Sequence, residues 1–425
     1  MTRMRLRAQA FIGLCSHRGS DVQFSRSLPS GAFVAVMETA SIALVHDWLD
    51  APGGGEAVFA ELLRMYPKAD VYTLVDFLSA AERSKLGIGR VTTSAWQRMP
   101  GARHWFRYAA LLYPNIVERF ELSRYDLIIS DSHAVAKGIR KRKNQVHVCY
   151  CYTPARFAWT MAATYGERAT GSNRWLAPFV DRAFARFRSW DRAASERVDH
   201  FVASSKHIGQ LIADCYGRRA DVVYPPVDVA RFACADTGAH TGPYVTVSRL
   251  VPYKRIDLLV EAFRRMPSRT LIIVGDGPER RHLARRLPSN VTLAGHIGDI
   301  ACATLVGNAR AFLFAAMEDF GIAPLEAQAA GTPVIAYQGG AITETIVDLD
   351  RPGPTGVLYD QQTPKAIIDA VGRFEREAAR ITRDACRKNA SRFGAERFRA
   401  EFGACVDEAL AMTRDEAPAV RPVDA

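Results

Sequence analysis

Two glutamates, Glu318 and Glu326, are separated by seven residues at the turn between a predicted strand and a predicted helix. The strand is predicted over 311–314, and the helix is predicted to open at Pro324, a favoured first-turn residue. The N-terminus of such a helix offers free N–H groups and a positive dipole end, which suit sugar hydroxyls or phosphate. Taken alone, the pattern also fits a charged turn in which Glu326 only complements the helix dipole.

Two cations follow another predicted strand, over 244–248. Arg249 lies just past the end of this strand, and Lys254 precedes a helix that is predicted to start near Ile256. Cations at the carboxyl end of a strand can neutralise a diphosphate when they face a cleft. A basic pair by itself is more often solvated surface charge.

Three consecutive glycines, Gly53, Gly54 and Gly55, precede Glu56 after the first predicted strand. Glycines let a backbone approach a ligand closely, and the helix predicted to follow Glu56 points its N-terminus at the same place. The spacing is neither GxGxxG nor a Walker loop, so this motif is weak alone.

Short apolar runs alternate with helix-like stretches from Ser41 onward, which is typical of parallel α/β sheets. The sequence predicts an α/β fold of two doubly wound, Rossmann-like domains that face a cleft, with ligands beyond the carboxyl ends of the strands. The predicted strands are 42–46, 71–75, 126–130, 146–152, 200–204 and 221–224 in the first half, then 244–248, 271–274, 291–293, 311–314, 333–337 and 356–359 in the second.

Composition narrows the class of protein. The chain has 425 residues, of which 48% are hydrophobic, and a formal charge of +11. This hydrophobic fraction excludes a disordered chain, and no apolar run approaches the roughly 18–20 residues that a spanning helix needs. The basic excess leaves nucleic acid, an anionic membrane or a phosphorylated small molecule as partners. The eight cysteines form no CxxC pair, so we expect reduced cytoplasmic thiols and no metal site.

Together the motifs resemble the retaining GT-B glycosyltransferases of the glycogen- and sucrose-synthase-like family. The match is closest to bacterial polysaccharide and O-antigen mannosyltransferases, and it covers about 42–410. Besides the glutamate pair, it is carried by stretches in the expected order: His46-Asp47-Trp48-Leu49 with the triple glycine, Ser130 to Gly138, Tyr224 to Asp228, Ser248 to Arg255, and Gly275 to Glu279.

The resemblance implies a donor site without metal or cofactor. Its catalytic residues would be Glu318, against the donor sugar, with Arg249 and Lys254 on the diphosphate of the nucleotide sugar. The implied donor-binding residues are Gly54 and Gly55 from the opposite domain, the backbone of Phe320, Gly321 and Ile322, and Glu326 on the ribose.

One stretch departs from the family pattern. Relatives commonly read Tyr-Cys-His-Thr-Pro where this chain has Tyr152 in place of the histidine, and Thr160 stands where an acidic residue is expected. Three interpretations stay open: a different donor sugar, reduced activity, or His133 taking part of the histidine's role. His133 alone also fits a satisfied turn histidine.

The expected domain organisation follows from the resemblance and from composition. We expect a disordered or mis-annotated leader, with Met37 as the real start, and C-terminal helices that could pack back on the N-terminal domain. In order, the parts are the leader over 1–40, an acceptor-side domain over 41–232, a linker over 233–243, a nucleotide-sugar-binding domain over 244–378, the helices over 379–415 and a tail over 416–425.

Two stretches raise the question of a membrane. In 174–192, six apolar residues share one helical arc, which fits a core-facing helix or a basic helix on a bilayer; a second aromatic and basic stretch runs from Arg103 to Tyr113. The run 137–143 holds five cations and is predicted to be an exposed loop, either simply solvated or attracted to anionic lipid.

The predicted function is transfer of a hexose, mannose being one candidate, to a lipid-linked saccharide in exopolysaccharide or O-antigen assembly. The predicted location is cytoplasmic, with peripheral attachment to the inner face of the plasma membrane left open. The alternatives are a nucleotide-sugar epimerase or glycan phosphorylase on the same fold, and a basic nucleic-acid-binding protein. No nucleic-acid signature accompanies the charge, which argues against the last.

Overall fold

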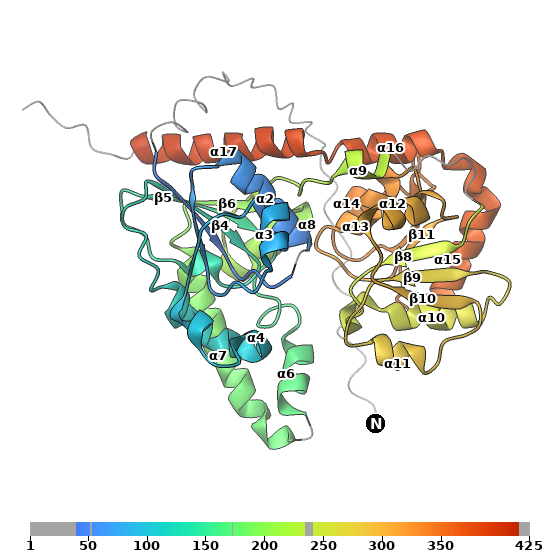
Figure 1. Cartoon of the computed structure of the whole chain (residues 1–425), viewed down its shortest axis with the longest axis horizontal. Helices are drawn as coiled ribbons and strands as arrows, with labels where there is room; N and C mark the ends of the chain where they lie inside the picture. Colours follow the sequence, from blue (N-terminus) through green and yellow to red (C-terminus); the bar gives the residue numbers. More distant parts are fainter. Residues whose placement is uncertain (1–39, 52, 172, 234–240, 416–425) are drawn as a thin grey trace, which may run out of the picture.

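The computed structural model describes residues 40–51, 53–171, 173–233 and 241–415, which form two α/β domains side by side (Figure 1). The sheet of the N-terminal domain has seven parallel strands in the order β3-β2-β1-β4-β5-β6-β7. They are β1 (Ile42–His46), β2 (Asp70–Thr73), β3 (Val91–Thr93), β4 (Leu127–Ser132), β5 (Val146–Cys151), β6 (His200–Ala203) and β7 (Asp221–Val222).

The sheet of the C-terminal domain has six parallel strands in the doubly wound order β10-β9-β8-β11-β12-β13. They are β8 (Tyr244–Val247), β9 (Leu271–Val274), β10 (Val291–Gly295), β11 (Phe312–Phe314), β12 (Val334–Tyr337) and β13 (Gly356–Tyr359). The predicted fold class is therefore confirmed. All twelve predicted strands overlap these elements, and β3 is the strand that the sequence did not reveal.

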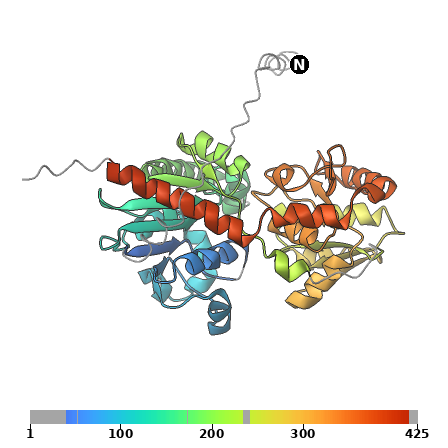
Figure 2. The ribbon, with the colours of Figure 1, turned by 90° about the horizontal axis from the view of Figure 1, so that it is seen from above.

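Helices cover both faces of each sheet (Figures 1 and 2). The N-terminal domain carries α2 (Gly54–Met65), α3 (Ala80–Leu86), η1 (Ala95–Arg98), α4 (Ala102–Trp105), η2 (Phe106–Leu112), α5 (Tyr113–Val117), η3 (Ala136–Gly138), α6 (Ala162–Thr170), η4 (Arg174–Leu176), α7 (Ala177–Ser195) and α8 (Lys206–Tyr216). The C-terminal domain carries α9 (Val229–Ala233), η5 (Pro252–Lys254), α10 (Ile256–Arg264), α11 (Arg280–Ala284), α12 (Asp299–Gly307), α13 (Ile322–Ala329), α14 (Ile342–Thr345), α15 (Pro364–Glu377), η6 (Ala378–Arg380) and α16 (Arg383–Ser391).

The last helix, α17 (Ala395–Asp415), leaves the C-terminal domain and lies across the N-terminal one (Figure 2). Its apolar side buries Phe398, Phe402 and Val406 in the same core as strands β1, β4 and β5. At the crossing, the Val227 amide donates to the Phe393 carbonyl at 2.8 Å, so the two segments that join the domains are bonded to each other.

Two helix starts differ from the prediction. Helix α2 begins at Gly54, so Gly53 is its N-cap, and Gly54 and Gly55 lie in its first turn instead of preceding it. Helix α13 begins at Ile322, two residues before the predicted Pro324, because Gly321 at φ 89° allows the chain to turn into the helix there. Glu326 consequently lies in the second turn.

The predicted leader over 1–40 and the tail over 416–425 fall almost wholly outside the described residues, as does most of the linker over 233–243. Among the helices that are described, none combines the length and the apolar character that crossing a membrane requires.

Candidate active site between the two domains

The centre of the candidate site is an ion pair between two residues that the sequence singled out. Lys254, at the end of η5, donates through Nζ to a carboxylate oxygen of Glu318, which follows β11, and both side chains are largely buried. Lys254 is followed by Arg255 at φ 52°, the one non-glycine residue with positive φ among those described. Backbone strain of this kind is concentrated at functional sites, so the turn is held in place by its surroundings.

A second cation reaches the same carboxylates from the other domain. Arg156, in the loop after β5, donates through Nε to Asp319 Oδ2 at 2.9 Å, and its guanidinium lies 3.6 Å from a Glu318 oxygen. Its guanidinium carbon lies 5.9 Å from the ring centre of Tyr253. Arg156 was not predicted from the sequence, although its place two residues after Pro154, just beyond a strand end, was a usable signal.

These contacts fix the ionisation of the site. Burial acts to raise the pKa of Glu318, but the charges of Lys254 and Arg156 outweigh it and hold the pKa below its usual range. Burial likewise raises the pKa of Asp319, and Arg156 opposes this only in part. Glu318 is therefore an ionised hydrogen-bond acceptor at neutral pH.

The glycine turn lies directly against the C-terminal domain. A Cβ atom at Gly54 would be 2.9 Å from Cδ1 of Ile322, in the first turn of α13. On the other side, the Tyr152 hydroxyl donates to the Gly55 carbonyl at 3.1 Å and so holds the turn in place. The predicted donor-binding residues Gly54, Gly55 and Ile322 are thus brought together.

The loop that carries His133 is held by the buried carboxylate of Asp47. Asp47 accepts hydrogen bonds from the amides of residues 133–136 at 2.6–2.8 Å, and its pKa is lowered because these bonds and His133 outweigh burial. The ring of His133 lies 6.4 Å from that of Tyr152. Beneath them, Asp131 accepts from His46 at 2.8 Å and, against the effect of burial, raises the pKa of His46 to about 9.

Arg249 is exposed, and its loop is held by close backbone approaches. The Leu250 amide donates to the Asp276 carbonyl at 2.9 Å, and a Cβ at Gly275 would be 2.0 Å from the Ser248 carbonyl oxygen. Only glycine fits there. Arg249 therefore extends from a rigid strand end, while Lys254 is already engaged by Glu318.

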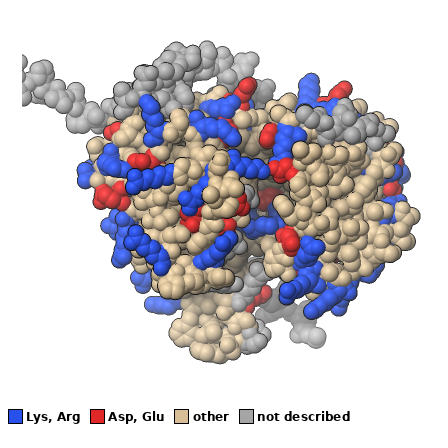
Figure 3. All heavy atoms as spheres, in the orientation of Figure 1, with Lys and Arg blue, Asp and Glu red and all other residues tan. Residues whose placement is uncertain are grey.

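Glu326 lies apart from this cluster. Burial raises its pKa to about 7, while Arg231 lowers it and Asp228 and Asp299 add to the rise. Asp299 also pairs with Lys85 of the N-terminal domain at 2.7 Å, and both residues line an open cavity of about 720 Å³ together with His296, Gly298, Ile300 and Ala301. Figure 3 shows the hollow between the domains, with acidic and basic side chains along it.

Phe320 does not present its side chain to the cleft. It is buried, and it stacks on Tyr224 with ring centres 5.8 Å apart, in a cluster that joins the domains. Polar contacts join the domains at the same interface. The Ser205 hydroxyl donates to the Asp319 carbonyl at 2.7 Å, and the Glu344 carboxylate accepts from the first two backbone amides of α8 at 2.9 Å each. The backbone of Phe320 and Gly321 is held by these neighbours.

The prediction of an exposed loop with five cations over 137–143 is confirmed for Arg140, Arg142 and Lys143 and is wrong for Lys137 and Lys141. Lys137 is completely buried, where it pairs with Asp191 at 2.8 Å and donates to the Ala134 carbonyl. Lys141 is largely buried against Asp199, and Arg140 pairs with Glu118. Three of the five cations therefore pair with carboxylates that are distant in the sequence, so this loop has less unpaired positive charge than the sequence suggested.

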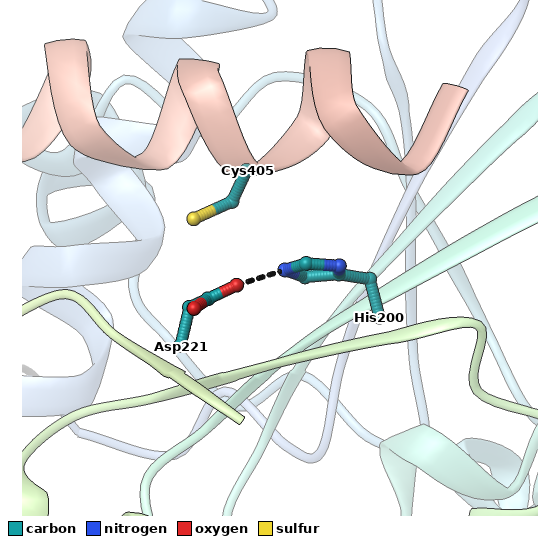
Figure 4. A group of neighbouring side chains, drawn as sticks. All are labelled: His200, Asp221 and Cys405. Atoms are coloured by element: carbon teal, nitrogen blue, oxygen red, sulfur yellow. Dashed lines mark ion pairs between the residues drawn. The ribbon is translucent and has the colours of Figure 1, made fainter. Parts of the chain in front are cut away.

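One group outside the cleft has metal-ligand chemistry. The ligand atoms of His200, Asp221 and Cys405 lie within 4.8 Å of one another (Figure 4). His200 pairs with Asp221 at 2.8 Å, and burial raises the pKa of the Cys405 thiol to about 12. His200 begins β6, at the amino end of the sheet and thus at the edge opposite the site, and the ion pair and thiol packing account for the group.

Two family models match the chain. Residues 242–393 match "Glycosyl transferases group 1", and residues 52–231 match "Glycosyltransferase Family 4". In the structure these are the C-terminal and N-terminal domains, respectively.

Individual proteins agree with these matches. The chain is 37% identical over 211 residues (43% of this chain, 54% of the relative) to a GDP-mannose-dependent alpha-(1-6)-phosphatidylinositol monomannoside mannosyltransferase of Mycolicibacterium smegmatis. It is 31% identical to a D-inositol 3-phosphate glycosyltransferase of Nocardia farcinica (44% and 47% covered). The chain spans about half the length of these curated relatives. Anabaena Alr3699/HepE, solved in complex with UDP, shares the fold with TM-score 0.62 at 17% identity (87% and 100% covered).

The two domains and the order of their strands give the chain the GT-B fold. Its C-terminal domain is similar to the group 1 glycosyltransferases, and its N-terminal domain is similar to glycosyltransferase family 4.

Proposed function

We propose that this protein transfers a hexose, with mannose as the leading candidate, from a nucleoside diphosphate sugar to a lipid-linked acceptor, with retention of anomeric configuration. The observation that carries the proposal is the Lys254–Glu318 pair at a strand end, faced by Arg156 from the other domain. The relatives named for GDP-mannose support mannose and a lipid acceptor.

In the proposed reaction, the diphosphate draws Lys254 away from Glu318. Arg249 and Lys254 then neutralise the departing diphosphate, which supplies from fixed cations the charge that a divalent ion would otherwise provide. The same exchange leaves Glu318 free to accept a hydrogen bond from a hydroxyl of the donor sugar. Glu326 would accept from the ribose hydroxyls, and the amides that open α13 would bind sugar hydroxyls or phosphate.

The acceptor hydroxyl would attack the anomeric carbon on the face from which the diphosphate leaves, and a donor phosphate oxygen would take its proton. A covalent route through Glu318 is less favourable, because a carboxylate shared by Lys254 and Arg156 is a weak nucleophile. The family matches favour a transferase over the nucleic-acid-binding alternative.

The proposed setting is polysaccharide or glycolipid assembly on the cytoplasmic face of a membrane. This setting is supported by relatives that act on phosphatidylinositol mannosides. It requires a surface that holds the enzyme at the bilayer.

A thermal-shift panel of GDP, UDP, ADP and their sugars tests the donor. We expect GDP-mannose to raise the melting temperature by several degrees, and Lys254→Ala to abolish the shift. Lys365→Ala, at an exposed lysine of the same domain, is the matched control and should keep it. An unchanged shift in Lys254→Ala would overturn the diphosphate assignment, and NMR of the glycosidic product would show retention or inversion.

A further inference from the structure

A helical hairpin with an apolar end projects from the N-terminal domain. It consists of α6, η4 and the first half of α7, and it extends below the domain in Figure 1. Trp175 and Phe179, at its end, are 69% and 66% exposed, with their rings edge to face 6.5 Å apart. On the face shown in Figure 3, this end is almost free of acidic and basic side chains.

Other exposed apolar residues lie on the neighbouring elements. Helix η2 contacts α7 and α4, and α6 contacts both α7 and η4. Six of the nine large hydrophobic side chains that are exposed among the described residues belong to the hairpin and to the segment 99–112 beside it, so exposed apolar side chains are concentrated in this part of the domain. We call these six the apolar end: Met99, Leu111, Leu112, Tyr165, Trp175 and Phe179.

The base of the hairpin is part of the core. Phe184 and Phe187 of α7 are buried, and Phe157 packs on Phe187 with ring centres 4.7 Å apart. The arc of apolar residues in 174–192 therefore divides: its C-terminal half is core, and Phe179 at the other end faces solvent. The core-facing interpretation is confirmed for the C-terminal half of the helix, and the bilayer interpretation stays a prediction for the other half.

The charge around the apolar end is one-sided. Residues 95–120 and 157–190 hold nine arginines, no lysine and three acidic residues. Arg103 in α4 and Arg182 and Arg186 in α7 are exposed. An apolar surface with a basic border fits an anionic bilayer, where each cation near the surface contributes about 1 kcal/mol. A second copy of this chain would bring the same arginines together and be repelled.

We propose that the apolar end inserts into the headgroup region of an anionic bilayer while the flanking arginines bind lipid phosphates. This inference rests on the proposed function, because the acceptor is taken to be lipid-linked. Phe157 links the hairpin to the site, since it directly follows Arg156, whose guanidinium pairs with Asp319. Insertion would therefore hold the site at a fixed height above the lipid.

Vesicle flotation tests the surface. We expect the wild type to float with phosphatidylglycerol vesicles at low salt, to be released by salt and to ignore pure phosphatidylcholine. The double variant Trp175→Ala/Phe179→Ala should lose at least about tenfold in binding. Met412→Ala, at an exposed methionine of α17, is the matched control and should float normally. Flotation of the double variant like the wild type would overturn the proposal, as would no flotation of the wild type.

Two further measurements separate the explanations. Brominated lipids should quench tryptophan fluorescence in the wild type and much less in Trp175→Phe, which should still bind; equal quenching in both would contradict insertion at this point. Light scattering tests for a dimer. If the wild type is a dimer and Trp175→Ala/Phe179→Ala is a monomer, a second copy of the chain covers the surface, and the bilayer proposal is overturned. If vesicles bind but no nucleotide sugar gives a thermal shift, the proposed function fails while the surface stands.

Discussion

Arg156 of the N-terminal domain and Asp319 of the C-terminal domain form an ion pair across the interface, with the Arg156 Nε 2.9 Å from Asp319 Oδ2. Both side chains are mostly buried. Removing one partner would leave the other charge poorly solvated, which is costly. The pair therefore couples the donor-binding turn to the loop that carries Tyr152.

Arg156→Ala is expected to lower kcat/KM about 10- to 100-fold, chiefly through the KM for the nucleotide sugar, because the domains close less firmly over it. Arg156→Lys should recover part of the loss, since it keeps the charge but not the paired donors. The measurement is steady-state kinetics in a double-mutant cycle with Asp319→Asn, which should show non-additive losses. Additive losses, or the same loss in Arg140→Ala, would argue against a specific coupling.

Glu326→Gln is expected to affect stability and binding in opposite directions. The pKa of Glu326 is raised from 4.5 to about 7, so the folded state binds more protons than the unfolded state between these pH values. Stability should consequently fall as pH rises through that window, and Glu326→Gln should remove this slope. Above pH 7, where the ionised glutamate is the better acceptor, the variant should bind the donor more weakly. Melting curves and donor titrations from pH 5 to 8 measure the stability and the donor affinity. If the stability of the variant and of the wild type depended on pH with the same slope, the role of Glu326 ionisation would be ruled out.

Gly54→Val is expected to hold the two domains apart. Its side chain would enter the space of Ile322, whose Cδ1 lies 2.9 Å from an ideal Cβ at that position. We predict a donor affinity at least about tenfold weaker and a larger radius of gyration by small-angle X-ray scattering. Ile322→Ala in the same chain should restore much of the affinity; no rescue would mean that Gly54 acts through its backbone alone.

Asp47→Ala is expected to destabilise the N-terminal domain by at least about 3 kcal/mol, because four buried amides lose their acceptor at about 1–3 kcal/mol each. The pKa of Asp47 is lowered on folding, so its contribution is complete above the usual carboxyl pKa and disappears as the pH falls through the folded pKa. Chemical denaturation at pH 7 checks this, with Asp369→Ala as an exposed control. A loss below about 1 kcal/mol would contradict the assigned role of Asp47.

The strands of both sheets could be predicted because buried parallel strands form continuous apolar runs, as in β1, where all five residues are buried. Strand β3 could not, since it is three residues long and largely accessible. Lys254 and Glu318 could be predicted because each follows a strand end in a recognisable motif. Arg156 was not predicted: its place just beyond a strand end was a usable signal, but the carboxylate with which it pairs lies 163 positions away in the sequence.

The failed prediction at Lys137 has the same origin. A run of cations indicates exposure only when no partner is available, and Asp191, which also accepts from Trp159 and Tyr216, supplies one inside the domain. Composition gives the number of charges, whereas the fold decides how many of them reach solvent.

The return of α17 to the N-terminal domain limits how the enzyme can move. Two domains joined by a single linker can rotate freely about it. Here the chain passes between the domains twice, and the two connecting segments are hydrogen-bonded to each other through Val227 and Phe393. A double connection of this kind resists rotation of one domain against the other and permits hinge bending about a single axis. Each cycle of opening and closing would then return Lys254 and Arg156 to the same places, so the alignment of the reacting atoms is repeated from one turnover to the next.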